Sequence, residues 1–191
     1  RLTADRNFMG RSFVYGLPEV NKKMIKSAQA IANPGCFATA IQLALVPLAA
    51  AKKLQNEVHV NAITGSTGAG AVPSATSHFS WRNNNISYYK PFVHQHLGEI
   101  GETLAHAQGS ASKLHFLPIR GNFTRGIFAT AYTAYEGSLE DAYALYESFY
   151  KDSPFTVVSK NKLALKQVVN TNRCLVNLHK HEGQLLVTSI I

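Results

Sequence analysis

The stretch Ala32-Asn33-Pro34-Gly35-Cys36-Phe37-Ala38-Thr39-Ala40 decides how the rest of the chain is interpreted. It places one cysteine directly after a Pro-Gly turn and directly before a long apolar run that extends to Leu48. This order predicts a turn followed by a buried helix whose first turn carries Cys36. The free N–H groups and the partial positive charge of a helix N-terminus favour a thiolate, the nucleophilic form of cysteine. The pattern therefore indicates a nucleophile at Cys36, against the alternative of a small buried cysteine at a turn.

The bulk composition limits the class of protein. A length of 191 residues fits a single domain, and a hydrophobic content of 46% is ordinary for a soluble globular protein. The sequence shows no signal-peptide pattern and no apolar run as long as a membrane span, so we expect no membrane partner. Cys36 and Cys174 do not make a disulfide framework, which favours the cytoplasm. Because the first residue is Arg1, we expect a piece of a longer protein.

The charge pattern favours a small anionic substrate over a nucleic acid. The chain has 19 basic and 11 acidic residues, for a net charge of +8. The basic residues are scattered, and no stripe interleaves them with aromatic residues as nucleic-acid-binding domains do. A positive net charge attracts small anions equally well.

The hydrophobic pattern predicts an α+β fold, with a mixed, largely antiparallel sheet and helices on one face. The polar segment 71–93 is expected to be a long loop that Tyr88, Tyr89 and Phe92 fasten to the body. The predicted helices cover residues 18–28, 36–53, 94–107 and 139–150, the second of them kinked or ended by Pro47. The predicted strands cover residues 12–15, 30–32, 57–64, 113–119, 123–135, 155–158, 167–169, 174–178 and 185–190, with a hairpin turn at Glu182-Gly183.

A glycine-rich loop, Gly65-Ser66-Thr67-Gly68-Ala69-Gly70, follows the strand at 57–64. Its spacing is not Gly-x-Gly-x-x-Gly and no apolar helix follows it, which argues against a dinucleotide-binding loop. Its backbone N–H groups could contact an anion, or its glycines could form a plain tight turn. The sequence leaves both alternatives open.

Two histidines are candidates for proton transfer to or from the cysteine. His94 and His96 stand at a loop-to-helix junction, from which side chains can point into a cleft. Because a metal interpretation of His-x-His needs a third ligand that the sequence does not offer, we expect no metal. The sequence does not rank one histidine above the other. Four further histidines lie in predicted strands, where a surface or core position is expected: His59, His115, His179 and His181.

The cysteine stretch also carries a resemblance to a known family. Residues 31–40, continued by Ala44-Leu45-Val46-Pro47, resemble the active-site signature of the N-acetyl-γ-glutamyl-phosphate reductases, which are relatives of the aspartate-semialdehyde dehydrogenases. Three further segments resemble motifs of the same family: the glycine-rich loop, His94-Gln95-His96-Leu97-Gly98-Glu99-Ile100 and Thr124-Arg125-Gly126-Ile127. The sequence departs from the family pattern at Ala71, at Gly98 and over residues 120–123.

The resemblance implies a fold and a reaction. The fold is a glyceraldehyde-3-phosphate dehydrogenase-like C-terminal domain, with residues 1–191 as one catalytic and dimerisation domain that lacks the family's Rossmann domain. The reaction is the reduction of N-acetyl-γ-glutamyl phosphate to the semialdehyde with NADPH, in arginine biosynthesis, through a thioester on Cys36. His94 or His96 moves the proton. The resemblance also implies a homodimer or homotetramer, and an isolated domain that binds NADPH weakly and turns over negligibly.

The resemblance also implies a set of binding residues. Arg125 is expected to hold a substrate anion through a bidentate contact. The alternative for Arg125 is a plain ion pair at the surface. Two other functions stay open for the chain: an aspartate-semialdehyde dehydrogenase-like enzyme, and a non-catalytic dimerisation module with an ordinary thiol at position 36. The residues expected to bind substrate are Arg125, Ser66, Gly68 and Asn33, and those expected to bind the cofactor are Gly35 and Gly68.

Overall fold

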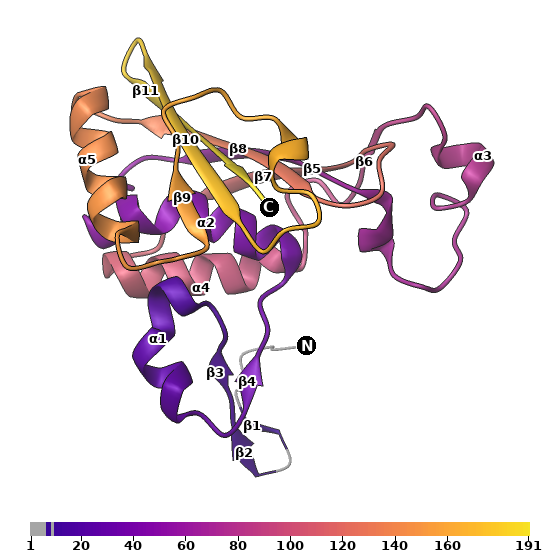
Figure 1. Ribbon diagram of the computed structural model, residues 1–191, viewed down its shortest axis with the longest axis horizontal. Helices are drawn as coiled ribbons and strands as arrows, with labels where there is room; N and C mark the ends of the chain where they lie inside the picture. The colour runs from indigo at the N-terminus through magenta and orange to yellow at the C-terminus, as the bar shows by residue number, and fades with distance from the viewer. Residues whose placement is uncertain (1–6, 9) are drawn as a thin grey trace.

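The computed structural model of the protein describes residues 7–8 and 10–191, and a seven-stranded sheet forms its centre (Figure 1). The strands are β5 (Val58–Thr64), β6 (Ser87–Tyr88), β7 (Leu114–Arg120), β8 (Ile127–Ala134), β9 (Thr156–Val158), β10 (Cys174–His181) and β11 (Gln184–Ile190). Their order is β6-β7-β5-β8-β11-β10-β9, with parallel pairs β5–β7 and β9–β10 and antiparallel pairs between the other neighbours. The sheet is mixed and largely antiparallel, which confirms the predicted α+β class.

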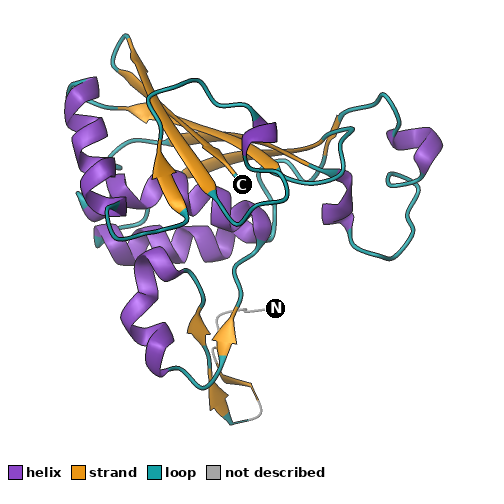
Figure 2. Ribbon diagram, in the orientation of Figure 1, coloured by secondary structure: helices purple, strands orange, loops and turns teal. Residues whose placement is uncertain are grey.

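Three helices form a layer on one face of this sheet (Figure 2). They are α2 (Cys36–Ala50), α4 (His96–Gln108) and α5 (Leu139–Tyr150). Helix α2 packs against β8 and β11, α4 packs beside α2 near β7, and α5 packs near β9 and β10. The smaller elements before α2 are β1 (Asn7–Phe8), β2 (Arg11–Ser12), β3 (Val14–Tyr15), α1 (Pro18–Ser27) and β4 (Ile31–Ala32).

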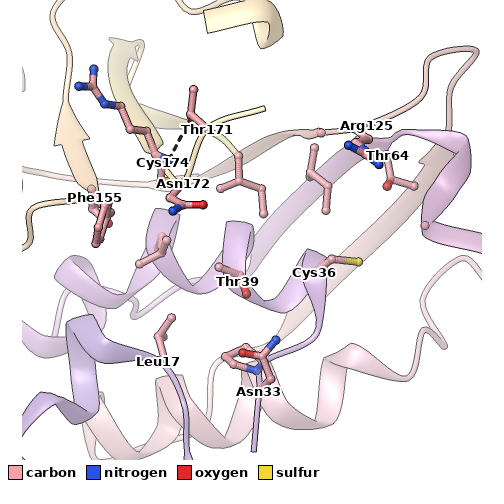
Figure 3. A pocket seen from close by; sticks show the side chains of 18 of the residues that line it. Leu17, Asn33, Cys36, Thr39, Thr64, Arg125, Phe155, Thr171, Asn172 and Cys174 are labelled. Carbon is pink, nitrogen blue, oxygen red and sulfur yellow. Dashed lines mark hydrogen bonds between the residues drawn. The ribbon is translucent and has the colours of Figure 1, made fainter. Parts of the chain in front are cut away.

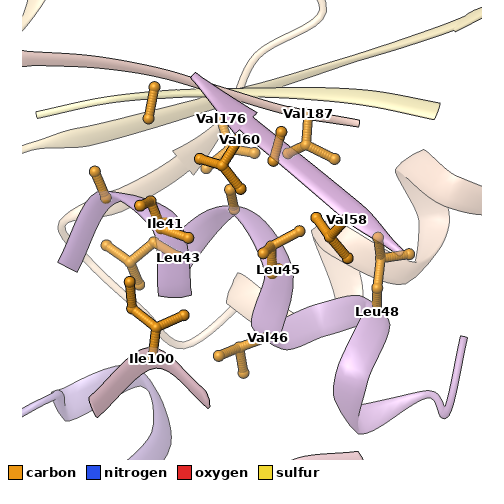
Figure 4. Close-up of a cluster of buried hydrophobic side chains, with 14 of the residues drawn as sticks. Ile41, Leu43, Leu45, Val46, Leu48, Val58, Val60, Ile100, Val176 and Val187 are labelled. Carbon is orange, nitrogen blue, oxygen red and sulfur yellow. The ribbon is translucent and has the colours of Figure 1, made fainter. Parts of the chain in front are cut away.

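Helix α2 is the centre of the hydrophobic core. Twelve of its fifteen residues are buried, which explains why its sequence is apolar all the way round. It lies between the inward-facing side chains of the sheet, such as Val60 and Val187, and Ile100 of α4 (Figure 4). Within the described part of the chain, no helix combines the length and hydrophobicity that crossing a bilayer requires.

Pro47 does not end α2, because another helix supplies the hydrogen bond that the proline removes. The helix continues past Pro47 to its last residue, Ala50. A proline has no N–H, so the carbonyl four residues earlier, that of Leu43, loses its helical donor. The Tyr150 hydroxyl of α5 donates to this buried carbonyl at 2.6 Å. Residues 107 positions apart in the chain therefore complete the helix, which the local pattern could not predict.

Replacing Tyr150 by phenylalanine is expected to lower the free energy of unfolding by about 1–3 kcal/mol, because it leaves the buried Leu43 carbonyl without a donor. Urea unfolding followed by circular dichroism measures the change. Tyr88→Phe is the matched control, since the Tyr88 side chain is 69% exposed. Equal stability of the two variants would contradict this explanation.

The structure corrects three details of the predicted elements. Residues 167–169, predicted as a strand, contain the end of the short turn η2 (Leu165–Gln167), and the apolar signal came from Val168, which is buried beside that turn. Arg125, predicted near the start of a strand, precedes β8 and lies in a loop. The strand predicted at 30–32 is the two-residue β4, and it is not a buried strand as its apolar residues suggest, because Ile31 is 48% exposed.

Candidate active site

One pocket of about 630 Å³ brings together several of the predicted site residues (Figure 3). Cys36 lies on its wall at the start of α2, with Asn33 in the turn just before the helix. Gly68 and Arg125 reach the same pocket from two loops at the end of the sheet. The other predicted site residues do not line this pocket in the described chain: Gly35, Ser66, His94 and His96.

The surroundings of Cys36 raise the pKa of its thiol, contrary to the predicted thiolate. The side chain is open to the pocket, yet desolvation is the largest cause of the rise. The backbone N–H groups of Phe37 and of Cys36 itself act in the opposite direction, as expected at a helix N-terminus, while the Glu99 carboxylate adds to the rise. Desolvation therefore outweighs the helix terminus, and the resting group is a neutral thiol.

Glu99, in the first turn of α4, holds the turn that precedes Cys36. Its Oε2 accepts a hydrogen bond from the Gly35 N–H at 3.1 Å and another from the Tyr15 hydroxyl at 2.7 Å. Its Oε1 lies 3.9 Å from Nε2 of His96. Because one carboxylate links α4, the Gly35 turn and β3, it fixes the position of Cys36 relative to His96.

His94 belongs to the aromatic core behind the site. Its side chain is buried, and its ring contacts those of Phe37, Tyr89 and Phe116. Burial, with smaller contributions from the neighbouring His96 and Lys90, lowers the pKa of His94 to about 4. Its Nδ1 accepts a hydrogen bond from the backbone N–H of His96 at 3.2 Å. His94 is thus a neutral, packed side chain that supports its neighbour.

His96, in contrast, packs directly against the turn that carries Cys36. A Cβ atom added at Gly35 would collide with the His96 ring. Burial lowers the pKa of His96, and the Glu99 carboxylate raises it. Its Nδ1 is buried without a hydrogen-bond partner among the described residues. Of the two histidines, His96 is the one whose ring lies against the turn that precedes Cys36.

Gly35→Ala is expected to lower the free energy of unfolding by about 1–3 kcal/mol, because the new methyl group overlaps His96 and approaches Glu99 Oε1 to 2.6 Å. Gly98→Ala in α4 is the control. A Cβ at Gly98 has no atom within 4 Å, so this helical substitution is expected to stabilise by about 0.5–1 kcal/mol. Urea unfolding of both variants tests whether the two changes in the free energy of unfolding have opposite signs. A stabilised Gly35→Ala protein would contradict the close packing of His96 against Gly35.

The glycine-rich loop is a packed turn beside the pocket. Its first three N–H groups donate to carbonyl groups of the loop before β8, those of Gly68 and Gly70 donate within the loop, and residues 66–69 form the short turn η1 (Ser66–Ala69). The Ser66 hydroxyl donates to the Phe123 carbonyl at 3.2 Å. Of the two alternatives left open by the sequence, the structure supports the tight turn, which holds the loop that carries Arg125. The backbone bonds run from the N–H groups of Gly65, Ser66 and Thr67 to the carbonyls of Gly126, Phe123 and Thr124, respectively.

One arginine brings positive charge to the pocket, and a second lies against the Tyr89 ring. Arg125 is exposed at the pocket and makes no ion pair or hydrogen bond with any described residue, so its guanidinium is free for an anion. Arg120, at the end of β7, lies 4.6 Å from the centre of the Tyr89 ring, and its Nε is buried without a partner in the described chain. Burial raises the pKa of Tyr89, and the nearby Arg120 guanidinium lowers it.

Sequence reasoning missed the residues that position the cysteine. Gln42, fully buried in α2, donates from Nε2 to the Glu99 carbonyl at 3.0 Å and to Thr103 Oγ1 at 3.1 Å. The Tyr15 hydroxyl lies 3.1 Å from its Oε1. One signal could have found this network, because Gln42 is the single amide inside an otherwise apolar helix.

A protein-family model described as "Semialdehyde dehydrogenase, dimerisation domain" matches residues 36–191. The chain belongs to this semialdehyde dehydrogenase dimerisation-domain family. The match includes Cys36, both histidines and Arg125, so the semialdehyde dehydrogenase domain contains the pocket wall at the start of α2 and the loop before β8.

Curated relatives of this semialdehyde dehydrogenase domain confirm the resemblance found in the motifs. N-acetyl-gamma-glutamyl-phosphate reductase of Flavobacterium johnsoniae is 59% identical over 192 residues, covering 100% of the chain and 59% of the relative. The reductase of Azobacteroides pseudotrichonymphae is 59% identical over 179 residues, covering 94% of the chain and 55% of the relative. The chain thus spans little more than half the length of these relatives.

Solved structures support the fold of the domain. Aspartate semialdehyde dehydrogenase II from Vibrio cholerae has a TM-score of 0.65 at 12% identity, covering 93% of the chain and 62% of that protein. The aspartate semialdehyde dehydrogenase of Francisella tularensis also has a TM-score of 0.65, at 10% identity, with 93% and 65% covered. At these identities, the likeness shows that the chain shares their fold.

Proposed function

We propose that this chain is the catalytic and dimerisation domain of an N-acetyl-γ-glutamyl-phosphate reductase of arginine biosynthesis. The observation that carries the proposal is the position of Cys36, an open thiol at the start of α2 with His96 packed against the preceding turn. The free guanidinium of Arg125 lies on the wall of the same pocket. The names of the curated relatives support the choice of substrate.

In the proposed acyl transfer, Sγ of Cys36 forms a bond to the acyl carbon of the substrate. The bond from that carbon to the phosphate oxygen breaks, and phosphate leaves with the electron pair. The thiol proton passes to His96, whose lowered pKa keeps it neutral and able to accept, while Glu99 stabilises the resulting imidazolium. The N–H groups of Cys36 and Phe37 are candidates to stabilise the oxygen anion that forms during attack.

NADPH is the proposed cofactor, and when bound it supplies the hydride that reduces the thioester to the aldehyde. Gly68 is a candidate to lie beside the cofactor, because it lines the pocket. Its open side is nearly empty, since a Cβ atom added there would meet only Thr64 Oγ1, at 3.2 Å. Gly35 fits less well, since its open side is filled by His96 and Glu99. What this chain offers the cofactor is therefore the pocket wall around Gly68.

Release of phosphate from two acyl phosphates tests the proposed substrate. The chain alone should release about one phosphate per chain from N-acetyl-γ-glutamyl phosphate, because acylation of the single reactive thiol, Cys36, does not require hydride. β-Aspartyl phosphate should react at least about tenfold more slowly if the pocket is built for the longer acyl group. A preference for β-aspartyl phosphate would instead assign the chain to an aspartate-semialdehyde dehydrogenase.

Arg125→Gln is expected to raise the half-saturating concentration of N-acetyl-γ-glutamyl phosphate by about 10- to 100-fold, through loss of a charge-assisted contact with the anion. The maximal rate of acylation should change much less. Arg11→Gln removes the same unit charge from the exposed strand β2 and serves as the control. If both variants shift the half-saturating concentration equally, the anion responds to net charge and Arg125 does not hold it.

We also propose that the chain self-associates, as a homodimer or homotetramer. The description of its family as a dimerisation domain supports this assembly. The sheet provides a surface for it, because the long helices α2, α4 and α5 cover only one of its faces in the described chain (Figure 2).

A further inference from the structure

Two histidines and one glutamate meet on the face of the sheet opposite the helical layer. Val58 and Val60 of β5 point into the core, so His59 between them points to the other face. The parallel pairing of β5 with β7 places His115 directly beside His59, and their imidazole rings stack with centroids 4.8 Å apart. Glu57, two residues before His59, lies on the same side, and its Oε2 is 2.8 Å from Nε2 of His115. The fold therefore groups three side chains that the sequence pattern did not predict as a group.

These three side chains have the donor atoms of a zinc site. Each offers one ligand atom, and the three ligand atoms lie within 4.8 Å of one another. Two imidazole nitrogens and one carboxylate oxygen, with a water molecule in the fourth position, form a tetrahedral ligand set that zinc commonly takes. We propose that Glu57, His59 and His115 bind a zinc ion.

The spacing of the ligand atoms is close to what zinc requires. Ligand atoms that lie about 2.0–2.1 Å from a tetrahedral ion are about 3.3–3.4 Å apart. Nε2 of His115 and Oε2 of Glu57, at 2.8 Å, share a hydrogen bond that the ion would replace. These two atoms need to separate by only about 0.5 Å to reach that spacing, which small side-chain rotations supply.

Neighbouring rings hold the two imidazoles in place. The Tyr132 ring stacks on that of His59 at 5.1 Å, and the Phe92 ring contacts that of His115 edge-on at 6.2 Å. The planes of the two imidazoles are 13° apart, so their in-plane lone pairs cannot both point at one ion in this orientation. One ring has to turn about its last torsion angle, which is broad for histidine. His59 is only partly buried, so its ring has room for this turn.

Backbone contacts fix the points from which the ligands extend. The Glu57 carbonyl accepts a hydrogen bond from the Thr133 hydroxyl at 3.0 Å, and the Val58 N–H donates to the Lys113 carbonyl at 2.9 Å. Strand β5 is paired along its length with β7 on one side and with β8 on the other. Ligands that extend from paired strands are held more precisely than ligands on a loop.

One lysine competes with the ion. Nζ of Lys113 lies 2.6 Å from Oε1 of Glu57, and Oε2 is the oxygen that faces His115. Both side chains of this ion pair are at least half exposed, so the pair contributes little stability. The positive charge of Lys113 opposes a cation bound at the same carboxylate. Zinc affinity should therefore rise when this charge is removed.

Zinc at this site would have a structural role. None of the three ligands lines the pocket that contains Cys36. The ion would connect β5 and β7 on the face of the sheet away from helix α2, and it would stabilise the folded chain by binding to it alone. Zinc binding is therefore independent of acyl transfer by Cys36.

Titration of the metal-free chain with Zn²⁺, in competition with a chromophoric chelator, tests the proposal. We expect one zinc ion per chain and a dissociation constant of about 10 µM or lower. A large excess of Mg²⁺ should not compete, because Mg²⁺ prefers oxygen ligands in an octahedral arrangement. The midpoint of thermal unfolding should rise with the zinc concentration. Dissociation constants measured at low and high chain concentration should agree, since all three ligands come from one chain.

Ligand variants separate this site from adventitious binding. His59→Gln and His115→Gln should each weaken zinc binding at least about 100-fold and abolish the shift in unfolding midpoint, while circular dichroism shows that the metal-free variants are folded. His179→Gln is the matched control, because His179 is exposed on β10, and it should bind zinc like the parent.

A gain of affinity gives the opposite sign. Lys113→Gln should tighten zinc binding by about two- to fivefold, through loss of the competing ion pair. Lys23→Gln removes the same unit charge from the exposed side of α1 and should leave the affinity unchanged. Equal effects of the two lysine variants would contradict the placement of the ion beside Glu57.

Cobalt in place of zinc shows which residues bind the ion. Two imidazoles and a carboxylate give a tetrahedral Co²⁺ spectrum without thiolate charge-transfer absorption in the near ultraviolet. Absorption of that kind, lost in a Cys36→Ser chain, would assign the metal to the catalytic pocket and overturn the proposal. A chain that binds no zinc in this range, or that binds it equally well without His59 and without His115, would also overturn it. Phosphate release by Cys36 is measured on the same samples, so loss of zinc binding with intact acyl transfer leaves the proposed function standing.

Discussion

Replacing Cys36 by serine is expected to reduce the rate of phosphate release from N-acetyl-γ-glutamyl phosphate at least about 1,000-fold. The hydroxyl is a much weaker nucleophile than the thiol, and the neutral His96 cannot generate an alkoxide as readily as a thiolate. A phosphate assay at substrate saturation measures the loss. Because the side chain is open to the pocket, the substitution should leave the free energy of unfolding nearly unchanged.

Cys174→Ser is the matched control for this experiment. Cys174 borders the same pocket, but its side chain is buried and lies 3.4 Å from Ser189 Oγ. Burial raises the pKa of Cys174 to about 12, so its thiol stays protonated and unreactive at neutral pH. The Cys174→Ser chain should keep the acyl-transfer rate within a few-fold of the parent. Similar losses of acyl-transfer rate in the two variants would mean that Cys36 is not the nucleophile.

His96→Asn is expected to slow phosphate release by about 100- to 10,000-fold, the usual contribution of a general base. The pH profile gives a sharper test than the rate alone. The pKa of Cys36 is raised and that of His96 is lowered, so the parent reacts near neutral pH from a neutral thiol and a neutral imidazole. Without His96, the thiol must ionise unaided, and the rate of the variant should keep rising above pH 9.

His94→Asn serves as the contrast, because His94 acts through packing. The folded pKa of about 4 is below the unfolded value of 6.5, so the unfolded chain binds the proton more readily. The neutral buried ring therefore contributes stability above pH 6.5, and this contribution is lost as the pH falls toward 4. The variant should lose that part of the pH dependence of unfolding. A folded His94→Asn chain that is as slow as His96→Asn would contradict the separate roles given to the two histidines.

Local patterns were sufficient to predict the turn, the helix and the nucleophile candidate. The Pro-Gly turn before Cys36 and the apolar run after it are contiguous, and the structure places α2 there with its first residue at Cys36. The capping box that begins α5 is equally local, since the Ser138 hydroxyl and the Asp141 carboxylate exchange bonds with each other's backbone. Elements of this kind depend on neighbours within a few residues.

The arrangement around the cysteine could not be predicted in this way, because it depends on distant residues. Glu99 holds the Gly35 turn from 64 residues away, and Tyr15 binds Glu99 across 84 residues. The raised pKa of Cys36 has the same origin, since the helix terminus is a local signal while desolvation depends on the assembled pocket. Residues 71–93 show a third case: of the three aromatic residues predicted to fasten this segment, Tyr89 packs against the core, while Tyr88 and Phe92 are exposed. The buried Arg82, which donates to the Arg120 carbonyl, is a fastening that the local pattern did not predict.

The most direct test of a nucleophilic Cys36 is to trap its acyl adduct. The chain is incubated with N-acetyl-γ-glutamyl phosphate without any hydride donor, digested at low pH, and analysed by mass spectrometry of the peptides. We predict one N-acetylglutamyl group on the peptide that contains Cys36, removable by hydroxylamine as a thioester. A chain that releases phosphate without this adduct, or that carries the adduct on Cys174, would contradict the account.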